Sequence, residues 1–134
     1  MSHIELENVK PMDIEKRSFE IITEELGDKK LAPGTELIVK RCIHTSADFD
    51  YADNLYFSEG AVEKALAAIQ KGACIVTDTQ MAKAGINKKS LARYGGEVYC
   101  FMSDEDVAEK AKELGTTRAS VSMGKAAKLD SNLI

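Results

Sequence analysis

The residues best suited to chemistry lie in the segment RCIHTSADFDYAD, residues 41–53. It contains His44, one of only two histidines in the chain, three residues after Arg41 and directly before Thr45. Histidine changes its protonation state near neutral pH more readily than other side chains, so His44 is a candidate general acid. The competing interpretation is a core histidine with one satisfied hydrogen bond, and the residues alone leave both interpretations open.

Three aspartates follow His44, namely Asp48, Asp50 and Asp53. They resemble a calcium-binding loop only superficially, because the glycine and the distal glutamate of that loop are absent. We interpret them as turn-forming and capping residues, which is a common use of aspartate. We therefore expect no metal site here.

A second candidate is Arg118, in the segment TTRAS. The pattern predicts a helix that Thr116 or Thr117 caps, which places Arg118 in its first turn. A cation is unfavourable at that end of a helix dipole, so this arginine is a candidate for binding a carboxylate through two parallel hydrogen bonds. Free backbone amides at the helix start would bind the same anion. An ion pair with a surface glutamate is the alternative.

The segment that holds His44 fits a helix better than a strand. Leu37–Val39 are consecutive apolar residues, which breaks the alternation of a half-buried strand. As a helix, Thr35 would cap its start, and Arg41 and His44 would share one stripe. An earlier helix is predicted over 14–26, ended by Gly27.

The remaining segments alternate between strand and helix patterns. We predict strands over 55–57, 73–78 and 97–102, and helices over 59–71, 79–86, 87–96, 105–114 and 118–129. This order predicts an α/β fold of three layers, with helices on both faces of a mostly parallel sheet, in a single domain of residues 1–134. Ligands of such folds gather at the carboxyl ends of strands, where the segment TDTQM lies.

Composition limits the partners. Of 134 residues, 44% are hydrophobic and 30% charged, and the formal net charge is -4, so we expect a globular protein without bulk attraction to nucleic acid. No segment has the length of a membrane span and no signal peptide is recognisable, so we expect no membrane partner. The cysteines Cys42, Cys74 and Cys100 lack metal-binding spacing and are expected as free thiols in the cytoplasm. His3 is assigned no role.

Four ordered blocks together resemble the precorrin-8X methylmutases, also known as cobalt-precorrin-8 methylmutases, of cobalamin biosynthesis. The blocks read IEKRSFEII, RCIHTSADFDYADNLYFSEGAV, GACIVTDTQMAKAGIN and GGEVYCFMSDEDVAEKAKELGTTRASVSM. The similarity runs from about Pro11 to Lys128. Four blocks in the family's order are far more specific than any single motif.

The resemblance implies an isomerase that moves a methyl group from C11 to C12 of a corrinoid tetrapyrrole. The substrate would be precorrin-8X or cobalt-precorrin-8 and the product hydrogenobyrinic or cobyrinic acid, with no cofactor required. His44 matches the family histidine that is proposed to protonate the macrocycle. With the resemblance, the residues expected to bind the substrate are Arg17, Ser18, Arg41, Thr45, Thr77, Asp78, Gln80, Met81, Thr117 and Arg118. Gln80 departs from the asparagine expected at its position.

The larger departure is at the end of the chain. Family members continue with a further strand and a GNAPTAL loop, whereas this sequence ends at Ile134, about where that strand should begin. We therefore expect a shortened sheet with an unpaired edge, and a homodimer or larger homo-oligomer that covers it. A shortened paralogue and a fragment both fit. The alternative function is a non-catalytic truncated homologue that binds a corrinoid or assembles with a partner.

Overall fold

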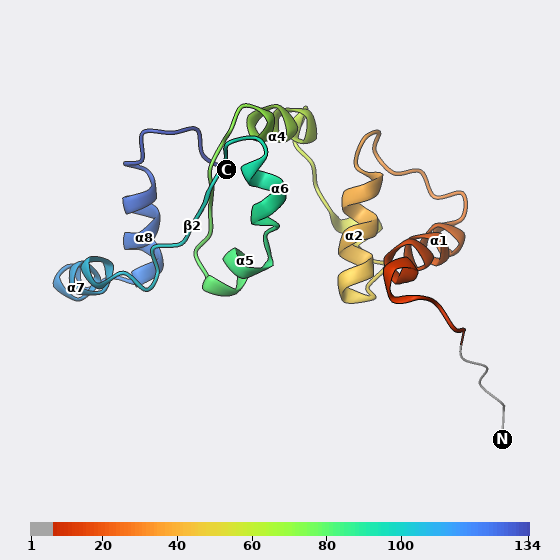
Figure 1. Ribbon diagram of the computed structural model, residues 1–134, viewed down its shortest axis with the longest axis horizontal. Helices are drawn as coiled ribbons and strands as arrows, with labels where there is room; N and C mark the ends of the chain where they lie inside the picture. Colours follow the sequence, from red (N-terminus) through yellow and green to blue (C-terminus); the bar gives the residue numbers. More distant parts are fainter. Residues whose placement is uncertain (1–6) are drawn as a thin grey trace, which may run out of the picture. The chain divides into compact units, whose positions relative to one another are not determined.

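Packing separates the chain into two units, Met1–Val62 and Glu63–Ile134, in the computed structural model, which describes residues 7–134 (Figure 1). The boundary falls in the first turn of helix α4 (Ala61–Gln70). The single domain over residues 1–134 stays a prediction, and His3 lies outside the described residues.

Helices form the first unit, in which the described residues contain no strand. The 3-10 turn η1 (Pro11–Asp13) leads into helix α1 (Ile14–Leu26), and Gly27 ends α1 with a positive φ of 54°. Helices α2 (Glu36–Ser46) and α3 (Tyr51–Asn54) follow. The two helices predicted over 14–26 and around His44 are confirmed.

The core of this unit lies between α1 and α2. Ile22 from α1 and Val39 and Ile43 from α2 are buried, and Phe19 and Leu26 pack against them. Positions 19, 22 and 26 share one face of α1, and positions 39 and 43 are four apart on α2, so each helix presents one apolar stripe. This contact fixes which residues of the two helices face each other.

The strand predicted over 55–57 is wrong. Leu55 and Phe57 pack against the core of the first unit, while Tyr56 between them is 88% exposed. The segment therefore has the alternation of a strand, but it forms no hydrogen-bonded ladder among the described residues. Alternation alone reports which side chains are buried and not whether a partner strand exists.

A small parallel sheet organises the second unit. Strands β1 (Ile75–Val76) and β2 (Val98–Tyr99) pair in parallel, with Ile75 opposite Val98. On the other side of β1, Cys74 forms a parallel bridge with Leu133. Both strands lie inside the predicted ranges and are shorter than predicted. The α/β class with a parallel sheet is confirmed.

Helices lie on both sides of these strands. Helices α5 (Gln80–Gly85) and α6 (Lys88–Ala92) connect β1 to β2, and α7 (Glu105–Leu114) and α8 (Arg118–Ala126) follow β2. Figure 1 shows α5 and α6 on one side of β2 and α7 and α8 on the other, which is the predicted order of layers. The helices predicted over these regions are confirmed, with shorter bounds at several ends.

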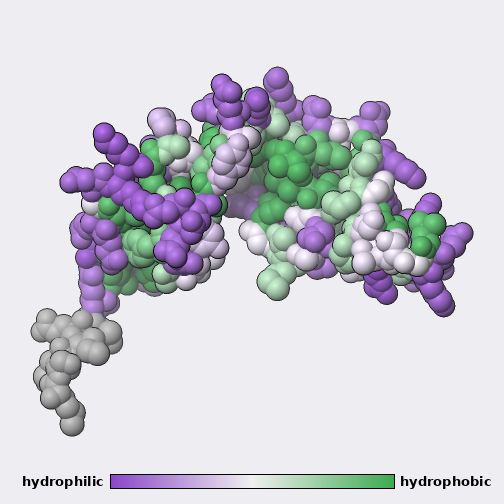
Figure 2. Space-filling view, turned by 180° about the vertical axis from the view of Figure 1, so that it is seen from behind, coloured by the Kyte–Doolittle hydropathy of each residue, from purple (hydrophilic) through white to green (hydrophobic). Residues whose placement is uncertain are grey.

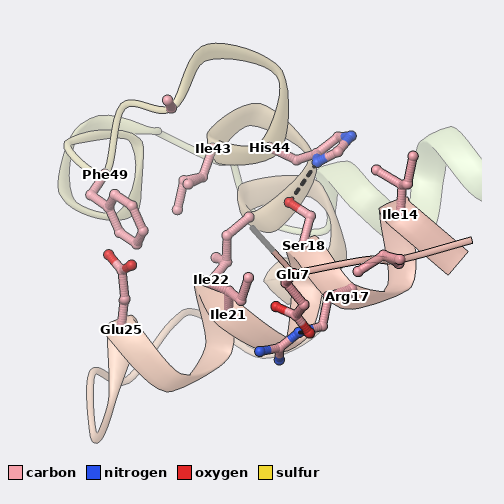
Figure 3. Close-up of a pocket in the computed structure, with 12 residues that line it drawn as sticks. Glu7, Ile14, Arg17, Ser18, Ile21, Ile22, Glu25, Ile43, His44 and Phe49 are labelled. Carbon is pink, nitrogen blue, oxygen red and sulfur yellow. Dashed lines mark hydrogen bonds and ion pairs between the residues drawn. The ribbon is translucent and has the colours of Figure 1, made fainter. Parts of the chain in front are cut away.

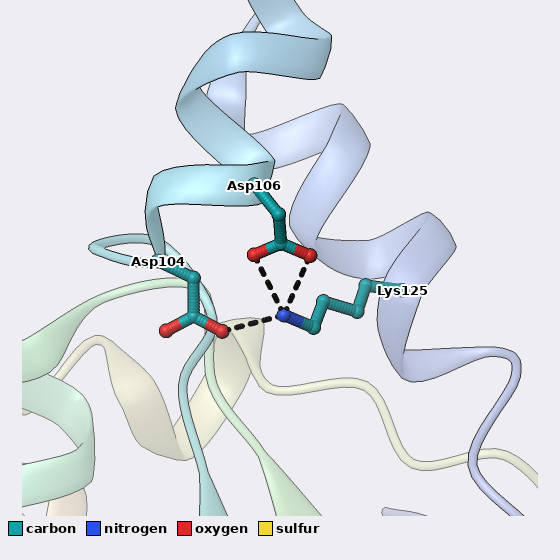
Figure 4. Close-up of polar contacts among 3 residues, drawn as sticks. All are labelled: Asp104, Asp106 and Lys125. Carbon is teal, nitrogen blue, oxygen red and sulfur yellow. Dashed lines mark hydrogen bonds and ion pairs between the residues drawn. The ribbon is translucent and has the colours of Figure 1, made fainter.

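A charged cluster ties α8 to the start of α7 (Figure 4). The Lys125 ammonium contacts a carboxylate oxygen of Asp104 at 2.7 Å and both carboxylate oxygens of Asp106 at 2.8 Å. Hydrogen bonding to Lys125 lowers the pKa of Asp106. Lys125 also lies 5.2 Å from the centre of the Phe101 ring, in the loop after β2. The last turn of α8 is thus held beside the loop that leaves the sheet.

Gly96 marks a close approach between the turn before β2 and the start of β1. A Cβ atom at Gly96 would lie 2.5 Å from the Ala73 carbonyl oxygen and 3.0 Å from the Leu91 side chain. A backbone oxygen cannot rotate away, so we predict that Gly96→Ala lowers the free energy of unfolding by about 1–3 kcal/mol, the usual range for overpacking. Urea unfolding followed by circular dichroism measures the change.

Gly124→Ala is the matched control, because a Cβ atom at Gly124 in α8 would meet nothing within 4 Å. Alanine favours a helix over glycine by about 0.5–1 kcal/mol, so this variant should be slightly more stable than the parent protein. Equal stabilities for the two variants would contradict the close approach at Gly96.

Candidate active site

His44 is held by Ser18 across the contact between α1 and α2. The His44 Nδ1 atom lies 2.7 Å from the Ser18 hydroxyl oxygen (Figure 3). The Phe19 ring meets the imidazole edge-on, with ring centres 5.7 Å apart. One ring nitrogen is therefore engaged by a hydroxyl, and Figure 3 shows the other pointing away from Ser18. The imidazole has a fixed orientation and one nitrogen available for proton exchange.

A cavity of about 340 Å³ lies beside His44 and Ser18. Its wall is mostly apolar and includes Ile22, Ile43 and Phe49, while its charged groups are Arg17, Glu7 and Glu25. Predominantly apolar walls with a few fixed polar groups are typical of small-molecule sites, whose volumes start at about 300 Å³. The cavity therefore suits an apolar edge of a ligand.

Arg17 lines this cavity but already holds two carboxylates. Its Nε atom donates to Glu7 at 2.8 Å, and a terminal nitrogen lies 3.6 Å from Glu20. The hydrogen bond to Glu7 is the main cause of the raised pKa of Arg17. Any carboxylate ligand would have to compete with these two glutamates.

Arg41 and Thr45 do not line the cavity. The Arg41 guanidinium makes a two-pronged contact with Glu15, at 2.8 Å for each nitrogen–oxygen pair. This pairing raises the pKa of Arg41 and lowers the pKa of Glu15. The Thr45 hydroxyl donates to the Arg41 carbonyl oxygen at 2.9 Å, so it is used inside α2.

The acidic segment after α2 forms turns, as interpreted from the sequence. The Asp48 carboxylate accepts the Asp50 backbone N–H at 2.9 Å, and Asp53 pairs with Lys29. Within residues 7–134, no group of three or more histidine, cysteine or acidic side chains is placed to hold a metal ion. The turn-forming role of Asp48 is confirmed.

Predicted residues of the second unit gather at the carboxyl end of β1. The Thr77 hydroxyl donates to the Thr79 carbonyl oxygen at 2.9 Å, and Asp78 is exposed beside it. Gln80 begins α5, and its amide donates to the Ser103 hydroxyl at 3.3 Å. Met81 is 84% exposed. Gln80 therefore links the segments that follow β1 and β2.

Thr117 and Arg118 form the start of α8. The Thr117 hydroxyl accepts the Ser120 backbone N–H at 3.2 Å, which confirms it as the N-cap. Arg118 is exposed and makes no ion pair with any residue in the described part of the chain. The predicted alternative, a pair with a surface glutamate, is not formed there.

Sequence reasoning missed Glu15 and Phe19. Both lie close to Ser18 on α1, and each contacts a residue of α2: Glu15 pairs with Arg41, and Phe19 lies under its guanidinium. The signal was their spacing, since positions 15, 18, 19 and 22 follow one helical stripe. That stripe also contains buried Ile22, so it must face α2.

The sequence matches the family model of precorrin-8X methylmutase over residues 13–134. The chain belongs to the precorrin-8X methylmutase family. It is 45% identical over 120 residues to the cobalt-precorrin-8 methylmutase of Priestia megaterium, covering 90% of this chain and 53% of that protein. It is 33% identical over 110 residues to the precorrin-8X methylmutase of Pseudomonas aeruginosa, covering 82% and 52%.

A solved structure agrees with the family. The crystal structure of precorrin-8X methylmutase from Thermus thermophilus matches with a TM-score of 0.77 and 38% identity, over 87% of this chain and 56% of that chain. The chain thus spans about half the length of the curated relatives it matches. Within residues 7–134, no helix is long and apolar enough to cross a membrane.

Proposed function

We propose that this chain acts in the isomerisation of precorrin-8X or cobalt-precorrin-8 to hydrogenobyrinic or cobyrinic acid. The observation that carries the proposal is an oriented imidazole beside a mostly apolar cavity, in a chain of this family. Curated relatives named cobalt-precorrin-8 methylmutase support the same reaction class.

His44 is the proposed general acid. A proton given to a nitrogen of the conjugated macrocycle withdraws electrons from C12, which lowers the barrier to attack at that carbon. The C11–methyl bond then breaks as the C12–methyl bond forms, with the bonding electron pair moving with the methyl group. The macrocycle returns the proton to the imidazole, so the reaction is an isomerisation and needs no redox cofactor.

Ser18 is the proposed positioning residue for this proton transfer. Its hydroxyl engages Nδ1 at 2.7 Å, so Nε2 is the nitrogen that can exchange a proton with the ligand. Ile43, directly before His44, is 1% exposed and anchors this turn of α2 in the core. Because the backbone that carries the imidazole is rigidly held, the imidazole keeps the geometry that proton transfer requires.

The remaining predicted residues of each unit are proposed as contacts for a corrinoid. Corrinoid acids of this class carry several peripheral carboxylates, and Arg118 at the start of α8, which forms no ion pair within residues 7–134, can offer its guanidinium to one of them. The other proposed contacts are Arg17, Arg41, Thr45, Thr77, Asp78, Gln80, Met81 and Thr117.

We also propose that the protein is cytoplasmic and acts as a homodimer or larger homo-oligomer. Cys42, Cys74 and Cys100 are free thiols, which suits a reducing compartment. Strand β2 pairs only with β1 among the described residues. Figure 2 shows hydrophobic residues on the surface of the molecule. Exposed large apolar side chains of the second unit include Leu66, Met81, Tyr94 and Leu114. Apolar surface and an open strand edge favour association.

Replacing the proposed acid should stop the chemistry without unfolding the protein. We expect His44→Ala to lower the conversion rate by about 10²–10⁴, the usual contribution of a general acid, and Ser18→Ala to lower it less. Because C11 joins the conjugated system once its methyl group has left, visible absorbance reports the conversion. Unchanged turnover in His44→Ala would exclude the acid role, and loss of the folded circular dichroism signal would favour a core histidine.

The same assay separates the two functional hypotheses. Parent protein that binds cobyrinic acid but converts no precorrin-8X or cobalt-precorrin-8 would support a non-catalytic, corrinoid-binding role. Conversion that depends on His44 would exclude that alternative.

Arg118→Lys tests carboxylate recognition at α8. Lysine keeps the charge but loses the planar fork, so we expect roughly a tenfold or greater loss of affinity for cobyrinic acid and little change in melting temperature. Arg93→Lys is the control, because Arg93 is an exposed arginine at the end of α6 outside the proposed contacts. Equal affinities in titrations of both variants would remove Arg118 from the site.

The proposed assembly is tested by light scattering coupled to size exclusion at low micromolar protein. We expect a mass of at least twice the 14.6 kDa of one chain. A single monomeric peak with a sharp, cooperative melt would show that the exposed strand edge needs no partner.

A further inference from the structure

The guanidinium of Arg41 is held on two sides. Its Cζ atom lies over the Phe19 ring, 5.0 Å from the ring centre, and its forked edge contacts both carboxylate oxygens of Glu15. A cation over an aromatic face is attracted by the ring without using its hydrogen-bond donors. The contact with Phe19 would therefore remain if Glu15 moved away.

The Phe19 ring lies between the Arg41 guanidinium and the proposed acid, His44, and contacts both. The same Phe19 ring meets the His44 imidazole edge-on at 5.7 Å, and Ser18, the next residue in the chain, engages Nδ1 of His44. Glu15 and Phe19 also line a groove of about 580 Å³ on α1. The Glu15 carboxylate thus borders open space on α1, within one helical turn of Ser18, which engages His44.

A ligand carboxylate can replace the Glu15 carboxylate on Arg41 at little cost. The side chains of Arg41 and Glu15 are each 54% exposed, and exposed ion pairs of this kind contribute little net stability because water solvates the separated charges well. A ligand carboxylate would make the same two hydrogen bonds that Glu15 makes. Replacing one carboxylate by another therefore requires little free energy.

We propose that Arg41 binds a peripheral carboxylate of the corrinoid and that Glu15 is an internal competitor, which occupies the fork until the ligand displaces it. The proposal deepens the proposed function and rests on it, because it names the chemical group that Arg41 recognises and the residue that sets the affinity. Glu15 would act as a placeholder that keeps the arginine in its binding geometry.

The rival role of the Arg41–Glu15 pair is a structural tie between α1 and α2. A tie predicts that removal of Glu15 weakens the fold and leaves ligand binding unchanged or weaker. A competitor predicts the opposite effect on binding, since the fork becomes free. The sign of the affinity change therefore separates the two roles.

The experiment compares cobyrinic acid with its fully esterified methyl derivative, which has no carboxylates, in absorbance titrations. We expect Glu15→Gln to bind cobyrinic acid about two- to fivefold more tightly, the range that an exposed ion pair represents. The ester should bind both proteins equally. Arg41→Gln should bind the acid roughly ten- to a hundredfold more weakly, and in that background Glu15→Gln should bring no gain.

Glu113→Gln is the charge-matched control, because Glu113 is an exposed residue of α7 outside the proposed contacts. A gain in Glu113→Gln equal to that in Glu15→Gln, or a gain for the ester, would overturn the proposal by showing a general charge effect. Unchanged or weaker binding of the acid by Glu15→Gln would also overturn it. Parent protein that binds neither corrinoid overturns the proposed function, and the inference with it.

Discussion

The apolar contact between α1 and α2 positions the polar groups of the candidate active site that lie in the first unit. Ile22, Val39 and Ile43 are buried in this contact, and burial of a large aliphatic side chain contributes about 1.5–3 kcal/mol. An exposed ion pair contributes about 0–1 kcal/mol. The apolar stripes therefore set the register of the two helices. Once that register is fixed, Ser18 meets His44 and Glu15 meets Arg41 as a consequence.

Local signals predicted the helices well and the strands poorly. Helices carry their own information in end signals such as Gly27 and Thr117, and in apolar stripes, so α1 and α8 could be read from the sequence. A strand also needs a partner that lies elsewhere in the chain. Residues 55–57 show the consequence: Leu55 and Phe57 are buried by helices of the first unit, and alternation was mistaken for pairing.

The residues of the candidate site also differ in how far the sequence could predict them. The sequence and its resemblance to a family named His44, Ser18 and Arg118 as site residues. They could not assign Glu15 to Arg41, because the two lie 26 residues apart and meet only through the register of two packed helices. Nor could they show that the Thr45 hydroxyl is used inside its own helix, a local hydrogen bond that competes with ligand binding.

The three arginines proposed to meet carboxylates differ in what a ligand must displace. Arg118 is exposed without an ion pair in the described residues, so an incoming carboxylate replaces only water. Arg17 and Arg41 each hold a glutamate at 2.8 Å, so a ligand exchanges one carboxylate for another. Exchange conserves the number of hydrogen bonds, so a competing glutamate lowers the affinity that its arginine gives, and a ligand without a carboxylate leaves the glutamate in place. On this argument Arg118 binds a carboxylate of an acidic corrinoid without competition, while Arg17 and Arg41 bind one only by displacing a glutamate.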